Sequence, residues 1–221
     1  MIYENRSDAG NRLARELADY KSQDPLILAL PRGGLPVAAE IARALNAPLD
    51  LVFVRKLGAP GRPELAMGAV IDGPKPYVVR NEDVLSFLPL SEEEFKRICD
   101  RELAEIERRR ALYLKDRSRA DPKDRVVIVV DDGVATGATT RAALRAIRKR
   151  SPKKLVLAVP VAPTSTLAEL EGEADEIVCL QSHDPFYAIG LYYADFHQVS
   201  DKEVIDILSK MRAPEALGKE E

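Results

Sequence analysis

Cysteine is scarce in this sequence of 221 residues, which contains only two. Cys99 and Cys179 stand far apart in apolar surroundings and form no Cys-x-x-Cys pair, so a reduced protein of the cytoplasm is the simplest expectation. His183 follows shortly after Cys179, but without a second pair of ligands these two residues make only half a zinc site. A structural zinc centre is therefore not expected.

Excess positive charge and long hydrophobic runs are also absent. The formal net charge is -3 and the pI is near 5.6, which disfavours nucleic acid as a partner because phosphate binding needs a basic surface. No apolar run approaches the roughly 20 residues that span a bilayer, so no membrane partner is expected. The polar N-terminus "MIYENRSDAG" lacks a basic region followed by an apolar one, so no signal peptide is expected. With 46% apolar and 31% charged residues, the composition is that of an ordinary soluble globular protein.

Short apolar runs alternate with amphipathic segments along the chain, and this alternation predicts the α/β class with a mostly parallel sheet and helices on both faces. Buried strands are expected at 26–30, 49–55, 125–130, 154–162 and 176–180, and a strand pair at 66–72 and 76–80. Helices are expected at 8–20, 35–45, 91–115, 137–150, 164–171 and 200–211.

Two capping boxes and one glycine-rich segment mark the boundaries of these elements. Ser91 with Glu94 opens the long helix at 91–115, and Ser200 with Glu203 opens the last one. The segment 56–65, "KLGAPGRPEL", is rich in Gly and Pro and is interpreted as a loop without regular structure. The sequence predicts one domain of residues 1–211 and a disordered tail at 212–221.

Four segments follow predicted strands and are therefore expected on one rim of the sheet, where α/β proteins bind their ligands. They are "PRGG" (31–34), "RKLGAPG" (55–61), "DDGVATGAT" (131–139) and "QSHDPF" (181–186). The convergence of these segments is the main structural inference that the sequence allows.

The segment 131–139 has the chemistry of a phosphate site. Gly133 and Gly137 allow close backbone approach, and the amides of residues 135–139 lie at a helix N-terminus that carries about half a positive charge. Asp131 and Asp132 can accept hydrogen bonds from sugar hydroxyls or bind a hydrated divalent cation. Neither a Walker A loop nor a dinucleotide G-x-G-x-x-G turn is present. A phosphate site beside two acids describes a pocket for a ribose 5-phosphate, and an ordinary strand-to-helix turn is the alternative.

The stretch "VVIVVDDGVATGATT" resembles the phosphoribosyl pyrophosphate (PRPP) signature of type I phosphoribosyltransferases, except that Gly133 replaces an aliphatic residue. The resemblance covers about residues 26–162 and implies a Rossmann-like fold with a small hood at about 180–200, to which the N-terminus contributes. The long helix expected at 91–115 has no counterpart in this resemblance and is interpreted as an insertion. It implies that Asp131 and Asp132 are catalytic and bind Mg²⁺, and that PRPP is held by Ala135, Thr136, Gly137, Ala138 and Thr139.

"LALPRGGLPVA" is similar to the pyrophosphate loop of the same family. The resemblance implies a cis peptide between Pro31 and Arg32, a catalytic charge on Arg32, and exposed N–H groups on Gly33 and Gly34. A plain glycine turn before a helix is the alternative.

"VRKLGAPGRPE" is similar to the stretch before the mobile catalytic loop of adenine-type members. Arg55 and Lys56 would then hold pyrophosphate or base, with Lys56 catalytic, and residues 57–66 would close over the site to exclude water. A solvated loop with ordinary surface charges is the alternative.

The implied reaction is that of a pentosyltransferase: the ribose 5-phosphate group of PRPP passes to a nitrogenous acceptor and pyrophosphate leaves, with Mg²⁺ as cofactor. A nucleobase in nucleotide salvage is the expected acceptor. Ala135 stands where the 6-oxopurine branch has its third acid, which disfavours hypoxanthine or guanine. Phe186, Tyr192 and Asp195 are candidates for recognising the base, and simple packing of the hood is at least as good an account of the two rings.

A second function on the same fold is a regulator that senses PRPP without turnover. Such a regulator usually has a basic RNA-binding face or a DNA-binding extension, and the acidic balance and short termini favour catalysis instead. A dinucleotide-binding dehydrogenase is excluded, because the sequence lacks a glycine-rich turn after the first strand that is followed by an acid about 20 residues further on. A homodimer is compatible with the resemblance, although nothing in the sequence decides it.

Overall fold

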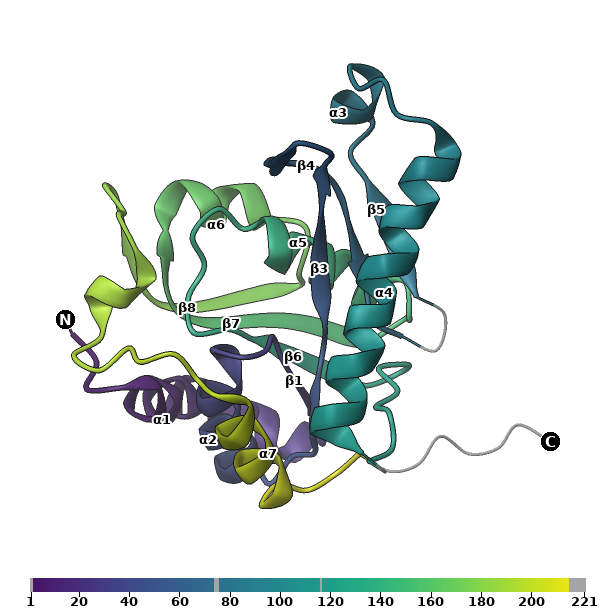
Figure 1. The fold of residues 1–221 in the computed structure, drawn as a ribbon. Helices are drawn as coiled ribbons and strands as arrows, with labels where there is room; N and C mark the ends of the chain where they lie inside the picture. Colours follow the sequence, from purple (N-terminus) through teal and green to yellow (C-terminus); the bar gives the residue numbers. More distant parts are fainter. Residues whose placement is uncertain (1, 74–75, 116, 215–221) are drawn as a thin grey trace.

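A computed structural model describes residues 2–73, 76–115 and 117–214. Its main sheet has five parallel strands in the order β2-β1-β6-β7-β8 (Figure 1). Side chains of β6 alternate between two hydrophobic cores: Val126, Ile128 and Val130 face one, and Val127 and Val129 face the other. This burial on both faces explains the continuous apolar runs. The strands are β1 (Leu26–Ala29), β2 (Leu49–Leu51), β6 (Val126–Val130), β7 (Lys154–Pro163) and β8 (Glu176–His183).

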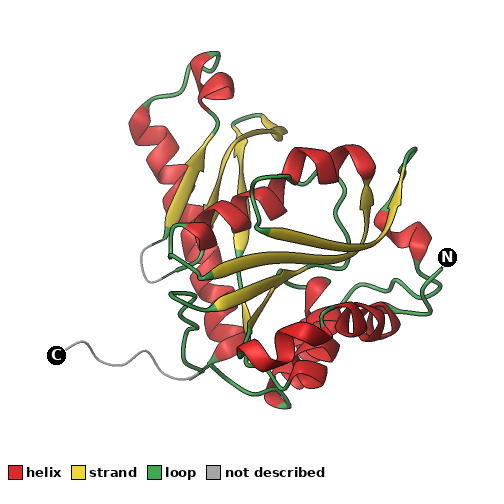
Figure 2. Ribbon diagram, turned by 180° about the vertical axis from the view of Figure 1, so that it is seen from behind, coloured by secondary structure: helices red, strands yellow, loops and turns green. Residues whose placement is uncertain are grey.

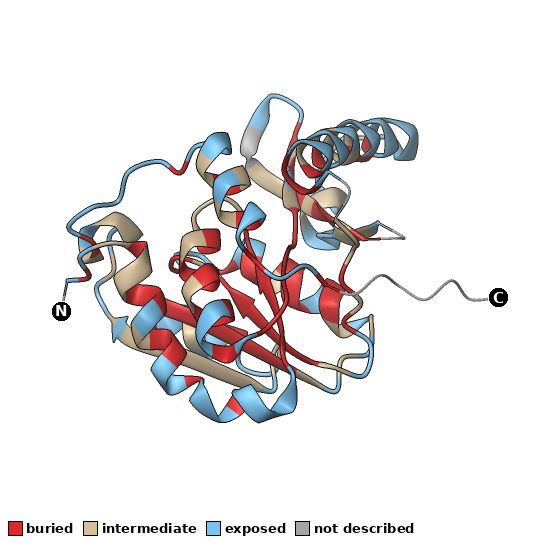
Figure 3. Cartoon of the chain, turned by 90° about the horizontal axis from the view of Figure 1, so that it is seen from below, coloured by how far each residue is buried: buried red, intermediate tan, exposed pale blue. Residues whose placement is uncertain are grey.

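Helices cover both faces of this sheet, as the sequence predicted. Below the sheet in Figure 1 lie α1 (Arg6–Glu16), α2 (Gly34–Leu45) and α7 (Asp201–Ser209), and above it lie α5 (Ala138–Arg148) and α6 (Thr164–Leu170). Figure 2 shows the same layers from behind. Buried residues gather in the sheet and on the inner sides of the helices (Figure 3). A 3₁₀ helix, η1 (Ala18–Gln23), follows α1.

A second, antiparallel sheet stands beside the first and carries the long helix. It consists of β3 (Val54–Ala59), β4 (Arg62–Ile71) and β5 (Tyr77–Arg80), in that order. A short helix, α3 (Glu82–Ser86), leads into α4 (Glu92–Leu114), which begins with the predicted capping box and packs against β3. No helix in the described part of the chain is long and apolar enough to cross a membrane.

Two expectations for residues 49–65 are wrong. The predicted strand 49–55 is two strands, because β2 ends at Leu51 and Val54 starts β3 in the second sheet. The segment 56–65 is not an irregular loop but most of a β-hairpin, in which Ala59 pairs with Arg62. The Pro60–Gly61 dipeptide forms the turn between them, with Gly61 at φ 71° as a two-residue turn after proline requires. Glycine and proline therefore mark a tight turn here rather than a loop.

The hood is an irregular segment after β8 that is joined to the N-terminus. It contains the 3₁₀ helix η2 (Ile189–Tyr192), and Tyr3 forms a β-bridge with Tyr193. The Tyr3 hydroxyl donates to the carbonyl of Pro160 at 2.8 Å, so the N-terminal residues hold the hood against β7. Residues 215–221 of the predicted tail lie outside the described residues.

Candidate functional site

The two acids that follow β6 lie at the centre of the site. Arg6 Nε donates to Asp132 Oδ2 at 2.8 Å, and Asp131 Oδ1 accepts the backbone N–H of Asp132 at 2.9 Å. Burial raises the pKa of Asp131 well above its ordinary value, and the charge of Asp132 raises it further. Burial also raises the pKa of Asp132, against the opposing effect of Arg6. Two neighbouring carboxylates with little access to solvent repel each other, so the pair favours a cation or a hydroxyl donor as its ligand.

Arg6 is a site residue that the sequence interpretation missed. Its side chain is 8% exposed and that of Asp132 is 11% exposed, so the ion pair is buried. One signal was available, because Arg6 occupies the first position of α1, where a basic residue opposes the helix dipole. Its partner, however, lies 126 positions away, and no local pattern identifies it.

The N-terminus of α5 is open to solvent. Gly137 precedes the helix at φ 71°, and no side chain of the described residues caps the first turn. The neighbouring loop is held in place by Thr166, whose Oγ1 donates to the carbonyl of Ala135 at 2.8 Å. The N–H groups of a first helical turn have no partner within the helix and carry partial positive charge, so this turn can accept an anion. Four of the five residues predicted to hold PRPP are exposed: Ala135, Thr136, Ala138 and Thr139.

The segment 31–34 packs directly on the acidic pair. The peptide between Pro31 and Arg32 is cis, which confirms what the resemblance implied. A Cβ on Gly33 would lie 2.1 Å from Asp132 Oδ2, and one on Gly34 would lie 2.7 Å from the carbonyl oxygen of Val130. Both glycines are therefore needed for close approach of the two loops.

Two predicted groups of this segment are already engaged within the protein. The N–H of Gly34 donates to the carbonyl of Leu30 at 3.0 Å across the turn at 31–33, so the expectation of an exposed N–H at Gly34 is wrong. Arg32 Nη1 lies 3.3 Å from Asp201 Oδ1, at the start of α7. The Arg32 side chain thus remains partly exposed, and solvent screens its ion pair with Asp201.

Arg55 and Lys56 point to opposite sides of β3, because neighbouring residues of a strand alternate. Arg55 donates from Nε and Nη2 to Glu102 Oε2 of α4, at 2.8 and 2.6 Å. Lys56 lines a cavity on the other side of the strand. The structure therefore does not bring the two side chains together.

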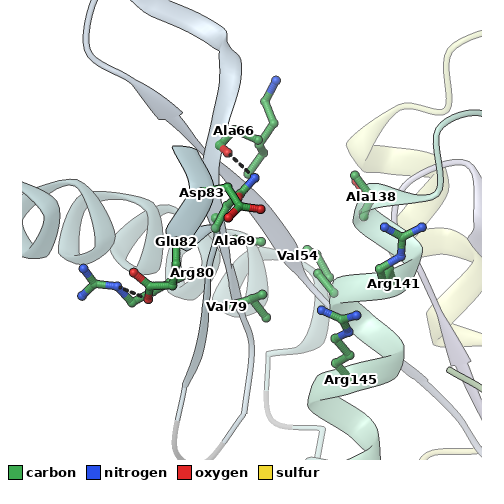
Figure 4. Close-up of a pocket in the computed structure, with 15 residues that line it drawn as sticks. Val54, Ala66, Ala69, Val79, Arg80, Glu82, Asp83, Ala138, Arg141 and Arg145 are labelled. Carbon is green, nitrogen blue, oxygen red and sulfur yellow. Dashed lines mark hydrogen bonds and ion pairs between the residues drawn. The ribbon is translucent and has the colours of Figure 1, made fainter. Parts of the chain in front are cut away.

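That cavity, of about 490 Å³, lies between the second sheet and α5 (Figure 4). Three predicted site residues line it, namely Lys56, Ala138 and Thr139, together with Arg141 and Arg145 of α5. The wall, within the described chain, does not include Asp131 or Asp132. The cavity opens beside the first turn of α5, and its volume is in the range of small-molecule sites.

The aromatic residues of the hood stack on one another. The rings of Phe186 and Tyr192 lie 5.2 Å apart and nearly parallel, and the ring of His183 lies 4.9 Å from that of Tyr192. Asp195 Oδ1 lies 3.0 Å from His197 Nδ1, and this contact lowers the pKa of Asp195. The structure thus brings Phe186 and Tyr192 together and directs Asp195 to a neighbour within the hood.

The hood also explains why glycine occurs at position 133. A Cβ there would lie 2.7 Å from Cγ2 of Ile189 in the hood. Ile189 occupies the space that an aliphatic side chain at 133 would need. The departure from the expected signature is therefore compensated by a residue that is distant in the sequence.

The donor set fits Mg²⁺ held mainly by a substrate. No group of three or more metal-ligating side chains occurs among the described residues. Asp131 and Asp132 supply carboxylate oxygens only, and Mg²⁺ commonly takes one or two carboxylates and completes its shell with water and substrate phosphates.

Comparisons with known proteins concern the family and the fold of the chain. The model of the phosphoribosyl transferase domain matches residues 1–196. Proteins from two strains of Mycobacterium tuberculosis, provisionally named phosphoribosyl transferases, are 42% identical over 209 residues, which cover 95% of this chain and 47% of theirs. The chain thus spans about half the length of these curated relatives.

Solved structures show the same fold. A protein of Thermus thermophilus is 40% identical, with a TM-score of 0.83, over 96% of this chain and 100% of that one. A hypothetical protein of Neisseria gonorrhoeae, solved with bound ppGpp, is 13% identical, with a TM-score of 0.51, over 95% and 94% of the two chains. The second likeness concerns the fold alone.

Proposed function

This chain belongs to the phosphoribosyl transferase domain family, and on that premise we propose that it transfers the ribose 5-phosphate group of PRPP to a nitrogenous acceptor with release of pyrophosphate. The observation that carries the proposal is the open first turn of α5 beside two neighbouring acids, of which Asp132 is buried and Asp131 is partly buried. An anionic phosphate and a sugar hydroxyl need these two environments at a short distance from each other.

Each part of the site then has a role. The first turn of α5 and its loop, residues 135–139, bind the 5-phosphate, and Asp131 and Asp132 bind the ribose hydroxyls. Arg32 and Lys56 stabilise the charge of the leaving pyrophosphate. Mg²⁺, held between Asp131, Asp132 and the substrate, would supply further charge neutralisation when bound.

Closure of the site is proposed for the β3–β4 hairpin. Its tip at Pro60–Gly61 belongs to the segment 57–66, which would exclude water from the oxocarbenium-like transition state. Arg55, which is paired with Glu102, supports the hairpin in this proposal rather than touching the substrate.

A nucleobase is the proposed acceptor, placed under the hood near Phe186, Tyr192 and Asp195. Nucleobase salvage in the cytoplasm is the corresponding process, and both cysteines are free thiols, as a reduced compartment requires. Light scattering of the purified protein would detect a homodimer, which the family resemblance allows.

The test is a pyrophosphate-release assay with Mg²⁺, PRPP and a panel of nucleobases. Asp131→Asn, alone or with Asp132→Asn, is expected to abolish PRPP use, because the neutral amide cannot balance the cation and has one acceptor oxygen instead of two. The single variant is the cleaner one, since Asp132 also pairs with Arg6. Thermal unfolding checks that each variant is folded.

Wild-type turnover in the double variant would contradict the proposed ribose site. Tight PRPP binding without release of pyrophosphate for any acceptor would favour the PRPP-sensing regulator. Loss of release on removal of Mg²⁺ by a chelator, restored by added Mg²⁺, is expected for the transferase.

A further inference from the structure

Arg6 connects three parts of the molecule through one guanidinium group. Its Nε donates to Asp132 Oδ2 and its Nη1 donates to the carbonyl of His197, both at 2.8 Å. The centre of the guanidinium lies 3.9 Å above the ring of Phe196. The buried charge of Arg6, on α1, therefore contacts both the acidic pair and the hood.

The planar fork of arginine makes these contacts dependent on one another. Its donors have a fixed mutual geometry, so Nε cannot follow a movement of the Asp132 carboxylate while Nη1 and the ring contact stay unchanged. Leaving the guanidinium unpaired is costly, because it is a buried charge. A change at the acidic pair must therefore be felt at Phe196 and His197.

The carboxylate of Asp132 has no free space on the side of Gly33 into which it could move. Gly33 packs against it so closely that a Cβ there would overlap Oδ2. His197, whose carbonyl accepts from Arg6, is also restrained. Its Nδ1 lies 3.0 Å from Asp195 Oδ1 and its Nε2 lies 2.9 Å from Glu203 Oε1, so the ring connects the hood to α7. Arg6 thus links two restrained bodies.

We propose that Arg6 is a positioning residue, which couples occupation of the acidic pair to the ordering of the hood at residues 194–199. The inference rests on the proposed function, since PRPP is the ligand that would occupy the pair. Arg6 touches neither substrate in this scheme and acts through Asp132.

The experiment compares wild-type protein with Arg6→Gln, Arg6→Lys and a matched control, Arg12→Gln. Arg12 also lies on α1, also pairs with an acid, Asp8, and also lies over a ring, that of Tyr3, but its ion pair does not involve Asp131 or Asp132. Calorimetry measures the affinity for PRPP with Mg²⁺, and hydrogen exchange measures protection of residues 131–139 and 194–199. Thermal unfolding shows whether each variant is folded.

In wild type and in Arg12→Gln, PRPP is expected to slow exchange in both segments. Arg6→Gln should weaken PRPP binding about 10–100-fold, the usual effect of losing a group that orients a ligating side chain. At saturating PRPP it should show protection of 131–139 but not of 194–199. Arg6→Lys should regain part of the affinity through its charge, without hood protection, since an ammonium lacks the fork. If Arg6→Gln does not fold, Arg6→Lys carries the test by itself.

Protection of 194–199 by saturating PRPP in Arg6→Lys, as strong as in wild type, would overturn the coupling while leaving the proposed function intact. A wild-type protein that fails to bind PRPP would instead overturn the proposed function, and the coupling with it. A uniform loss of stability without any difference between the two segments would show that Arg6 has only a structural role.

Discussion

Space, rather than backbone freedom, explains the glycine at position 33. Its φ is −61°, which any residue adopts, yet its α-carbon faces the carboxylate of Asp132 without room for a methyl group. The sequence interpretation treated Gly33 as an N–H donor to a phosphate. The structure adds a steric requirement that depends on a residue about a hundred positions away.

Gly33→Ala is therefore expected to lower the free energy of unfolding by about 1–3 kcal/mol, the usual cost of overpacking. In an Asp132→Ala background the same change should cost far less, because the three nearest atoms to the new Cβ all belong to the Asp132 carboxyl group. Urea unfolding of the wild type, the two single variants and the double variant measures the coupling between positions 33 and 132. Equal costs in both backgrounds would contradict the packing described here.

His197 gives the hood a pH-dependent contribution to stability. Its pKa is raised, first by the hydrogen bond to Glu203 and then by that to Asp195. A raised folded-state pKa means that this contribution is fully present below the unfolded value, about 6.5, and is lost as the pH rises through the folded-state pKa.

We expect His197→Gln to reduce the free energy of unfolding at about pH 6, where the wild-type imidazolium interacts with both acids. Near pH 9 the difference should be much smaller. Since the ring is about half exposed, with 56% of its side chain accessible, the effect is modest. Urea unfolding at the two pH values measures it, and a difference independent of pH would show that charge is not the cause.

At the scale of elements, β3 separates two roles that the sequence interpretation joined. The neighbouring helix α4, for which the resemblance offered no counterpart, pairs with Arg55 through Glu102, and the Arg80 guanidinium lies 4.4 Å from the ring centre of Phe95 of α4. The long helix thus supports the second sheet. Lys56, on the opposite side of β3, belongs to the cavity beside α5.

Arg55→Gln is accordingly expected to lower stability by about 1 kcal/mol, as for a partly exposed ion pair, and to leave PRPP affinity unchanged. Lys56→Gln is expected to slow pyrophosphate release with little change in stability. Urea unfolding and the release assay, applied to both variants, distinguish the two roles. Equal effects of the neighbouring substitutions on release would show that the strand does not separate them.

For the whole molecule, a buried ionic cluster joins the second sheet to the first. Asp72, after β4, pairs with Arg110 of α4, and with Arg119 at 3.1 Å. Asp50 of β2 lies 3.7 Å from the same Arg110 and accepts the N–H of Ala120 at 2.8 Å. The two sheets are therefore joined by Asp50, Asp72 and Arg110, whose side chains are almost fully removed from solvent.

Arg110→Met is expected to lower the free energy of unfolding by about 3 kcal/mol, because it leaves buried carboxylates with less compensation. Arg108→Met, which loses an exposed pair with Glu105 on the same helix, should cost far less, because solvent screens that pair. Urea unfolding at pH 7 compares the two. Similar small losses would indicate that the cluster contributes little to docking of the sheets.

The sequence by itself determined the features that depend on short-range patterns. Continuous apolar runs specified where the strands of the main sheet begin, although not where β2 ends. Capping boxes specified the starts of α4 and α7, and the motif at 131–139 indicated an open helix N-terminus after paired acids. Such features arise from residues within one or two turns of each other, so spacing alone reveals them.

Only the tertiary structure decided which distant groups meet. It assigned residues 54–71 to a separate sheet, turned Arg55 toward α4, filled the space beside Gly133 with Ile189, and placed Arg6 on Asp132. These outcomes depend on contacts between segments far apart in the chain, and their energies come from burial and pairing that exist only after the core has formed. A local pattern can show that a residue is charged or small, but its partner is chosen by the packing of the whole molecule.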